Sequence, residues 1–159
     1  MKKTAALAFC LVALLAFGAS SAQAAGPLNF YIRGGILISG IPDFTQYWGL
    51  VGANLDLNFG LLSISPECDM TISKFFSFSM VELLPGVILN INLANFYIGA
   101  GIILPVVIVS GAEDLHGALY LKANAGIKLG GLKLQVFAAG PNYAPFSDSL
   151  LGATLGAGF

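Results

Sequence analysis

The chain ends in a strand-length run whose two faces differ in polarity. Within residues 149–159, apolar side chains occupy every second position: Leu151, Ala153, Leu155, Ala157 and Phe159. Glycine and threonine fill the positions between them. Because side chains alternate between the two faces of an extended strand, this spacing predicts a β-strand that is apolar on one face only. A fold built from such strands must cover each apolar face with more protein or with lipid.

The other end of the chain has the pattern of an export signal. Two lysines precede an apolar stretch over residues 4–17, and a small-x-small sequence ends at Ala24. Together these parts predict a secretory signal peptide over residues 1–24 that is cleaved after Ala24. We therefore expect an exported mature chain, residues 25–159, that forms one domain.

The expected mature chain has too few charges for a water-soluble domain. Without the two lysines of the signal peptide, it has five basic and eight acidic residues, so 13 of its 135 residues are charged. Soluble domains carry roughly 25% charged residues. The mean hydropathy of the full 159-residue sequence, +0.84, calls for burial in lipid or against a very apolar partner. With no basic patch in the sequence, we expect no nucleic-acid partner.

The periodicity favours strands over helices as the apolar elements. A lipid-embedded chain must pair all its backbone polar groups, which only helices and closed barrels do. The one apolar segment long enough for a helix, residues 96–112, contains glycines, a proline and a β-branched run that suit a strand better. Residues 51–59 and 118–129 alternate with a period of two. The sequence therefore predicts an all-β fold, a transmembrane antiparallel up-and-down β-barrel.

Eight strands are predicted, over residues 28–39, 47–59, 62–71, 78–92, 96–108, 117–129, 131–139 and 149–159. The connections between them are alternately long and short, and bacterial barrels have their short turns on the periplasmic side. We therefore place both termini in the periplasm. A turn at Pro85-Gly86 is an alternative that gives ten strands. Pro66 and Pro105 should each mark a bulge or a strand end, because a closed barrel has no edge strand for a proline.

With the apolar faces toward lipid, the charged residues of the strands point into the barrel. An eight-stranded barrel is just wide enough for side chains to fill. The sequence predicts a polar network that fills this interior, with four basic and four acidic members: Arg33, Asp56, Glu67, Asp69, Glu82, Lys122, Lys128 and Lys133. Small inward residues would leave room for a narrow pore, which is the alternative: Gly35, Gly52, Gly99, Gly101, Gly126, Gly152, Gly156 and Gly158.

Aromatic residues are predicted at both ends of the strands, as in the girdles that mark membrane interfaces. At the periplasmic end these are Phe30, Phe59, Phe96 and Phe159. At the outer end they are Tyr47, Trp48, Phe76 and Phe78. Tyr120 and Phe137 fit neither girdle and are expected to point inward.

The terminal phenylalanine and the alternation before it resemble the closing strand of a bacterial outer-membrane barrel. Over residues 28–159, the pattern is similar to the small eight-stranded barrels of the OmpA/OmpX type, although only the terminal motif is specific. The resemblance implies that the barrel-assembly machinery recognises Leu151, Ala153, Leu155, Ala157 and Phe159. It implies a location in the outer membrane of a Gram-negative bacterium, with lipid as the surrounding partner. We expect no periplasmic peptidoglycan-binding domain.

Catalysis and metal binding have little support in the sequence. Small barrels that act on lipid A are enzymes with a histidine, a serine and an acid near the outer rim. His116 is the only histidine, and it has Ser110, Glu113 and Asp114 nearby, but Gly117 and Ala118 follow it, so the His-x-Ser arrangement is absent. The acidic residues of the outer loops have no metal-ligand spacing. We expect no enzymatic activity, cofactor or metal.

The function predicted from the sequence is that of an integral outer-membrane protein with a structural or surface-interaction role. A narrow, porin-like pore for ions or very small solutes is the first alternative. A secreted, soluble β-barrel carrier is the second. The sequence does not identify a surface ligand.

Overall fold

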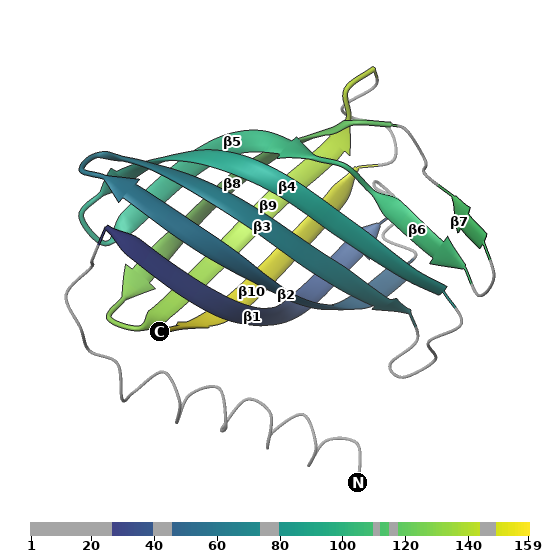
Figure 1. Cartoon of the computed structure of the whole chain (residues 1–159), viewed down its shortest axis with the longest axis horizontal. Coiled ribbons are helices and arrows are strands. Elements are labelled where there is room, and N and C mark those ends of the chain that lie inside the picture. The colour runs from purple at the N-terminus through teal and green to yellow at the C-terminus, as the bar shows by residue number, and fades with distance from the viewer. Residues whose placement is uncertain (1–26, 40–45, 74–79, 110–111, 115–117, 144–148) are drawn as a thin grey trace, which may run out of the picture.

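The computed structural model describes residues 27–39, 46–73, 80–109, 112–114, 118–143 and 149–159. All of the strands in these residues belong to one antiparallel sheet (Figure 1). They are β1 (Leu28–Ser39), β2 (Gln46–Phe59), β3 (Leu62–Ser73), β4 (Met80–Leu93), β5 (Phe96–Ile103), β6 (Val106–Val109), β7 (Ala112–Asp114), β8 (Tyr120–Leu129), β9 (Leu132–Pro141) and β10 (Leu150–Gly158). The predicted signal peptide lies outside the described residues.

The sheet closes on itself into a barrel of eight strands. β1 pairs with β2 on one side and with β10 on the other, from Tyr31↔Gly158 to Ile38↔Leu151. The ring runs β1, β2, β3, β4, β5, β8, β9, β10, and each neighbouring pair is antiparallel. Closure removes the free sheet edges that a strand-built protein could not leave unpaired in lipid. The predicted eight-stranded, up-and-down antiparallel barrel is confirmed.

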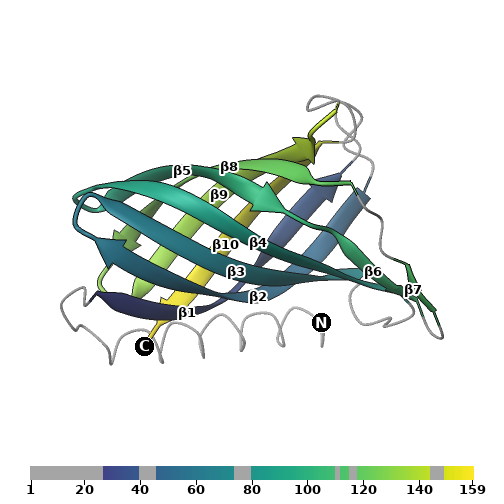
Figure 2. The same ribbon diagram turned by 45° about the horizontal axis from the view of Figure 1, so that its top comes forward.

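β6 and β7 continue the sheet beyond this ring. The sequence predicts one strand over residues 96–108 with a bulge or strand end at Pro105, and in the structure β5 ends at Ile103 and β6 begins at Val106. β6 pairs with β4, as β5 does. On its other side β6 pairs with β7, whereas β5 pairs with β8. Figures 1 and 2 show β6 and β7 projecting past the rim of the barrel. β7 lies in the segment that was predicted as a loop, residues 109–116.

The prolines explain where the ladders are interrupted. Pro105 separates β5 from β6, so it marks a strand end, as predicted. Pro85 lies inside β4, whose pairing with β3 runs on through Cys68↔Pro85. The ten-stranded alternative, which needed a turn at this proline, is therefore wrong. Across the break between β5 and β6, the Leu104 N–H donates to the Pro85 carbonyl at 2.9 Å.

Pro66 lies inside β3 and causes neither a bulge nor a strand end. The ladder between β3 and β4 passes through Pro66↔Val87 without interruption. On the β2 side, the bridges stop at Asn54↔Glu67 and resume at Leu57↔Ile64, with the same number of residues on both strands. The expectation of a bulge was wrong, because a missing N–H can be tolerated by omitting bridges on one side only.

Three two-residue turns lie together at one end of the barrel, which we call the short-turn end. They join β2 to β3, β4 to β5 and β8 to β9. The first residue of each turn has a positive φ, as in type II′ hairpins: Gly60 (74°), Ala94 (54°) and Gly130 (58°). Glycine adopts this conformation without strain, whereas Ala94 does so with a side chain. The strand ends that the longer connections join lie at the opposite end, which we call the long-loop end, and most residues of these connections are outside the described residues.

The wall of the barrel is apolar outside and mainly polar inside. Along β3, Ser63, Ser65, Glu67, Asp69 and Thr71 are buried and alternate with exposed residues. Most of the exposed large side chains of the ring are apolar, among them Ile32, Ile36, Val51, Ile64, Val87, Leu89, Ile91, Ile98, Ile102, Leu121, Leu134 and Val136. A water-soluble barrel has the reverse arrangement.

The aromatic residues at the short-turn end lie where they were predicted. Phe30, Phe59, Phe96 and Phe159 are all exposed around this end. At the long-loop end, Tyr47 is exposed, but the prediction for Trp48 was wrong. Trp48 pairs with the buried Leu37 and packs against the interior instead. Phe137 is buried inside the barrel, as expected, and Phe76 and Phe78 lie outside the described residues.

Candidate functional site in the barrel interior

Four charged side chains from three strands meet at mid-height in the barrel and form what we call the central cluster: Arg33, Glu67, Asp69 and Lys122. The Arg33 guanidinium donates to both Asp69 carboxylate oxygens at 2.7 Å and to Glu67 Oε2 at 2.8 Å. It also donates to Gln135 Oε1 at 3.0 Å. These bonds use the planar fork of arginine, which matches the geometry of carboxylates.

Lys122 completes the central cluster on its other side. Its ammonium group forms a buried ion pair with Glu67 and lies 4.0 Å from Asp69. The Nζ also lies 4.1 Å from the centre of the Phe137 ring. Two basic and two acidic groups balance, so the desolvated charges of this cluster offset one another.

A second group of charges, which we call the turn-end cluster, lies nearer the short-turn end. The Asp56 carboxylate pairs with Lys128 at 2.9 Å and with Lys133 at 2.8 Å. It also accepts hydrogen bonds from Asn54 and Ser65, both at 2.7 Å. One carboxylate thus faces two ammonium groups, which leaves one net positive charge.

Two tyrosine rings enclose the turn-end cluster. The Lys133 Nζ lies 5.1 Å from the ring centre of Tyr31 and 5.0 Å from that of Tyr97. The Lys128 Nζ lies 5.3 Å from the Tyr97 ring. A cation over the face of an aromatic ring is attracted by the ring quadrupole. The rings therefore offset part of the excess positive charge of this cluster.

On the side of the barrel formed by β1, β2, β9 and β10, the interior changes from polar to apolar toward the long-loop end. Leu37, Leu50 and Phe137 form a buried cluster, against which Trp48 and Leu150 pack. We call these five residues the apolar layer. Leu37 lies four residues beyond Arg33 on β1, and Phe137 lies two residues beyond Gln135 on β9, so the layer follows directly on the central cluster. No described side chain of this layer carries a charge.

Three of the inward glycines lie beneath aromatic rings. Tyr31 pairs with Gly158, Tyr97 with Gly126 and Phe137 with Gly152. A Cβ atom placed on any of these three glycines would overlap the paired ring. The sequence had suggested that small inward residues leave room for a pore. At these positions the glycines instead make room for rings, which fill the space.

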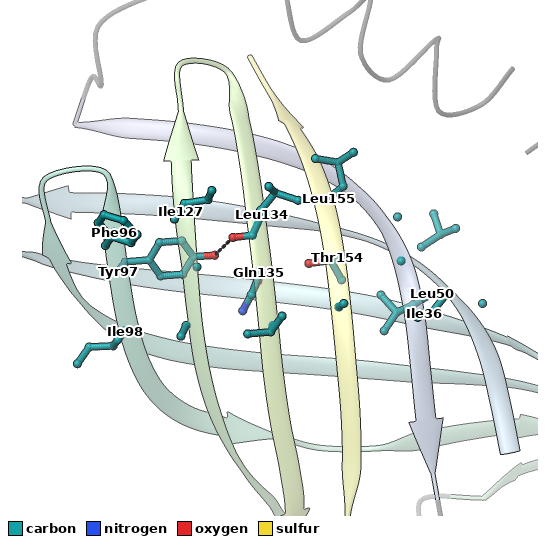
Figure 3. Close-up of a pocket in the computed structure, with 18 of the residues that line it drawn as sticks. Ile36, Leu50, Phe96, Tyr97, Ile98, Ile127, Leu134, Gln135, Thr154 and Leu155 are labelled. Atoms are coloured by element: carbon teal, nitrogen blue, oxygen red, sulfur yellow. Dashed lines mark hydrogen bonds between the residues drawn. The ribbon is translucent and has the colours of Figure 1, made fainter. Parts of the chain in front are cut away.

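Figure 3 shows Tyr97 and the apolar hollow that lies beside it on the wall of the barrel. The Tyr97 hydroxyl donates to the Leu134 carbonyl at 3.3 Å, across Gly126. The hollow is lined by outward side chains such as Ile98, Ile127 and Leu134, and none of its described lining residues is charged. It has the chemistry of a lipid-facing surface and not that of a site for a polar ligand.

Seven of the eight charged residues predicted to face the interior take part in the two clusters. The eighth, Glu82, is half-buried and lies opposite Thr71 near the long-loop end. The Thr71 hydroxyl donates to the Glu82 carbonyl at 3.5 Å. Sequence reasoning omitted the neutral partners of the clusters, although each lies at an inward position of its strand: Asn54, Ser65, Asn90 and Gln135.

The residues of the predicted assembly signal lie on β10 and directly after it. Leu151 and Phe159 are exposed, while Ala153 and Leu155 are partly exposed. Ala157 is 1% exposed. The Phe159 N–H donates to the Phe30 carbonyl at 2.9 Å, which ties the end of the chain to the start of β1.

Other sequence predictions fall on residues about which less can be said. His116 and Ser110 lie outside the described residues, and Glu113 and Asp114 belong to β7. Among the residues that the structure describes, no group of three or more His, Cys, Asp or Glu side chains could hold a metal ion. None of the described residues forms a helix long and apolar enough to cross a membrane.

Comparison with known proteins supports the fold. No protein-family model matches the sequence, and no curated protein matches it significantly. Among solved structures, the chain is similar to Neisserial surface protein A, with a TM-score of 0.54 and 11% sequence identity. The similarity covers 86% of this chain and 97% of the other. At this identity, the likeness shows a shared barrel fold.

Proposed function

We propose that this chain is an integral outer-membrane β-barrel protein with a structural or surface-interaction role and a filled interior. The observation that carries the proposal is the inverted polarity of the barrel. Arg33 and Asp56 are 3% and 0% exposed in the interior, whereas Phe59 and Leu89 are 65% and 54% exposed on the wall. Lipid is the solvent in which such a wall is stable.

The same inversion argues against a soluble carrier. A soluble barrel binds apolar ligands in an apolar interior and presents polar groups to water. Here the interior holds ion pairs, and the exposed apolar residues extend around the whole ring. Contiguous apolar surfaces of this extent are rare on monomeric soluble proteins.

The filled interior argues against a conduit and supports a role at the surface. An ion would have to pass the turn-end cluster, the central cluster and the apolar layer in succession. The side chains of these layers contact one another inside the barrel, such as Arg33 with Asp69 and Asp56 with Lys133. The name of the similar structure, a surface protein, agrees with a role for the long-loop end.

Membrane fractionation followed by a gel-shift assay tests this proposal. The full chain is expressed in a Gram-negative host, and its membranes are extracted with detergent. We expect the protein in the outer-membrane fraction, with a band that shifts when the sample is boiled, because a closed barrel offers SDS no free edge. The mass of the extracted protein should correspond to a chain that begins at Ala25.

A soluble periplasmic protein would overturn the membrane assignment and revive the carrier. This result would be a protein that is recovered without detergent and gives the same band before and after boiling. A chain that retains residues 1–24 would instead overturn only the predicted cleavage.

A further inference from the structure

The turn-end cluster carries one positive charge more than its carboxylate can cancel. Asp56 pairs with both Lys128 and Lys133. The central cluster has two basic and two acidic groups, so it has no negative charge to spare for its neighbour. The two tyrosine rings attract a cation but carry no net charge. Since a buried charge without an opposite charge is costly, the excess in this cluster needs a counter-ion.

Asp56 has no further capacity to accept hydrogen bonds. Its Oδ1 accepts from Asn54 and Ser65 at 2.7 Å and from Lys133 at 2.8 Å. Its Oδ2 lies 2.9 Å from the Nζ atoms of both Lys133 and Lys128. A carboxylate offers about four lone-pair sites, so these contacts occupy it fully. Any other proton of the two ammonium groups must find its acceptor elsewhere.

Lys128 is the member of the cluster that solution can reach. Its side chain is 19% exposed, against 4% for that of Lys133. The Lys128 Nζ contacts Asp56 and donates to Asn92 Oδ1 at 3.2 Å, which uses two of its three protons. Because the Asn92 amide oxygen accepts from Lys128, the amide nitrogen of this half-buried side chain is a second donor beside it. The opening thus presents N–H groups from two strands, β4 and β8.

The short-turn end has no acidic side chain near this opening. The described residues there contain neither Asp nor Glu: 27–30, 58–63, 90–97, 127–133 and 157–159. Apart from the C-terminal carboxylate, the charged groups of these segments are the two lysines of the cluster. Glu82, by contrast, lies near the long-loop end. An anion that approaches from the short-turn end therefore meets a positive potential without repulsion by acidic side chains.

From this charge balance we propose that the opening at the short-turn end binds a small anion, such as chloride or a simple carboxylate. The N–H groups of Lys128 and Asn92 hold the anion, and Lys133 adds a second positive charge behind them. With one anion bound, two positive charges face two negative ones. Water or a neutral amide oxygen would satisfy the free N–H groups but would leave the excess charge in place. This binding site goes beyond the proposed function, which needs no ligand inside the barrel.

The line width of the chloride NMR signal tests the site on the unmodified protein. Chloride that exchanges with a protein site gives a broader signal than chloride in free solution. The folded barrel in uncharged detergent micelles is measured in dilute chloride, with gluconate to keep the ionic strength constant. We expect a broader signal than for micelles alone. Added acetate or phosphate should narrow the signal, because both compete for the same N–H groups.

Three variants assign the binding to Lys128. Lys128→Met leaves Asp56 with Lys133 alone, so the cluster becomes neutral, and we expect the excess broadening to fall by more than half. Lys128→Arg keeps the charge and the donors and should retain most of it. Lys74→Met is the control for net charge, because it removes the same charge from the predicted connection between residues 71 and 78, and it should leave the broadening unchanged. All variants are first checked for a heat-shifted band, and the measurement on the unmodified protein stands without them.

Three outcomes would overturn the anion site. The first is a folded, unmodified barrel that broadens the chloride signal no more than micelles do. The second is broadening that neither acetate nor phosphate reduces. The third is an equal loss of broadening in Lys128→Met and Lys74→Met, which would show that binding follows net charge alone. None of these results bears on the outer-membrane location, which fractionation and the heat-shifted band test separately.

Discussion

The two halves of the barrel interior are filled by different means. Toward the short-turn end, seven charged side chains pair in two clusters, with amides, hydroxyls and aromatic rings around them. Toward the long-loop end, five apolar and aromatic side chains pack together without charge. The polar half is stabilised by ion pairs and hydrogen bonds, and the apolar half by the packing of its side chains against one another.

This difference predicts different responses to substitution. Removing one partner of a buried ion pair leaves an uncompensated charge, which costs more than the pair itself contributes. Removing an apolar group leaves a cavity, and its cost depends on how far the neighbours can close it. Loss of a single ion-pair partner should therefore strongly lower the stability of the polar half. Loss of an apolar group should lower the stability of the apolar half by an amount that depends on the cavity it leaves.

The largest effect is expected for Arg33→Met, which keeps an unbranched, flexible side chain but removes the guanidinium and its charge. Glu67 keeps Lys122 as a partner, but Asp69 loses both of its close bonds. We expect a loss of about 4 kcal/mol in the free energy of unfolding. Urea titration of the folded protein in lipid vesicles measures it.

Ile32→Met provides the control, because Ile32 is the neighbouring outward residue and stays in contact with lipid. We expect its change to lie within about 0.5 kcal/mol. If Arg33→Met lowered the free energy of unfolding no more than this control, the claim that ion pairing stabilises the polar half would be wrong.

Phe137→Ala should have the next largest effect, because it removes a ring that contacts both halves. The loss of packing over Gly152 and beneath Lys122 should cost about 3 kcal/mol in unfolding free energy. The same variant should admit water to the apolar layer. Water-to-methyl magnetisation transfer at Leu37, measured by NMR, checks this second effect. We expect no transfer in the unmodified protein, and its absence from the variant as well would contradict the prediction.

A smaller loss is expected for Gly152→Ala, which inserts a methyl group under the Phe137 ring. The ring must shift, and overpacking of this kind costs about 2 kcal/mol. Gly34→Ala is the matched control, since the nearest atom to its added Cβ would be the Leu50 carbonyl oxygen at 3.8 Å. Equal unfolding free energies for the two variants would show that the ring does not occupy the space above Gly152.

The smallest effect lies outside both halves, in the turn between β4 and β5. Ala94 adopts a φ of 54°, a conformation that glycine reaches without strain. We expect Ala94→Gly to stabilise the barrel by about 0.5 kcal/mol, the relief of strain being offset in part by the entropy of glycine. A urea midpoint below that of the unmodified protein would contradict this account of the turn.

Much of the fold could be predicted from the sequence because the period of a strand is two. Alternation identified the eight ring strands, and it assigned Arg33 and Asp56 to one face and Val51 and Leu121 to the other. Short turns were evident from their length and from Gly60 and Gly130. These features are local, so they can be recognised without knowing which strands are neighbours.

What could not be predicted depends on contacts across strands. That Phe137 lies over Gly152, or that Asp56 faces two lysines, follows from the register of pairing, which local periodicity does not contain. The break at Pro105 was expected as a bulge or a strand end, but the pairing of β6 with β7 beyond it was not. Trp48 was placed in a girdle because it is aromatic and lies at a strand end, although it shares a face of its strand with Asn54 and Asp56, so the alternation alone would have placed it inward.

Single-channel recording in planar bilayers tests the filled interior most directly. Protein that shows a heat-shifted band is reconstituted at low density, and current is recorded over a range of voltages in concentrated salt. The account predicts no steady openings, because both clusters and the apolar layer block the axis. Steady, reproducible openings of the unmodified protein would contradict it and would establish the narrow pore instead.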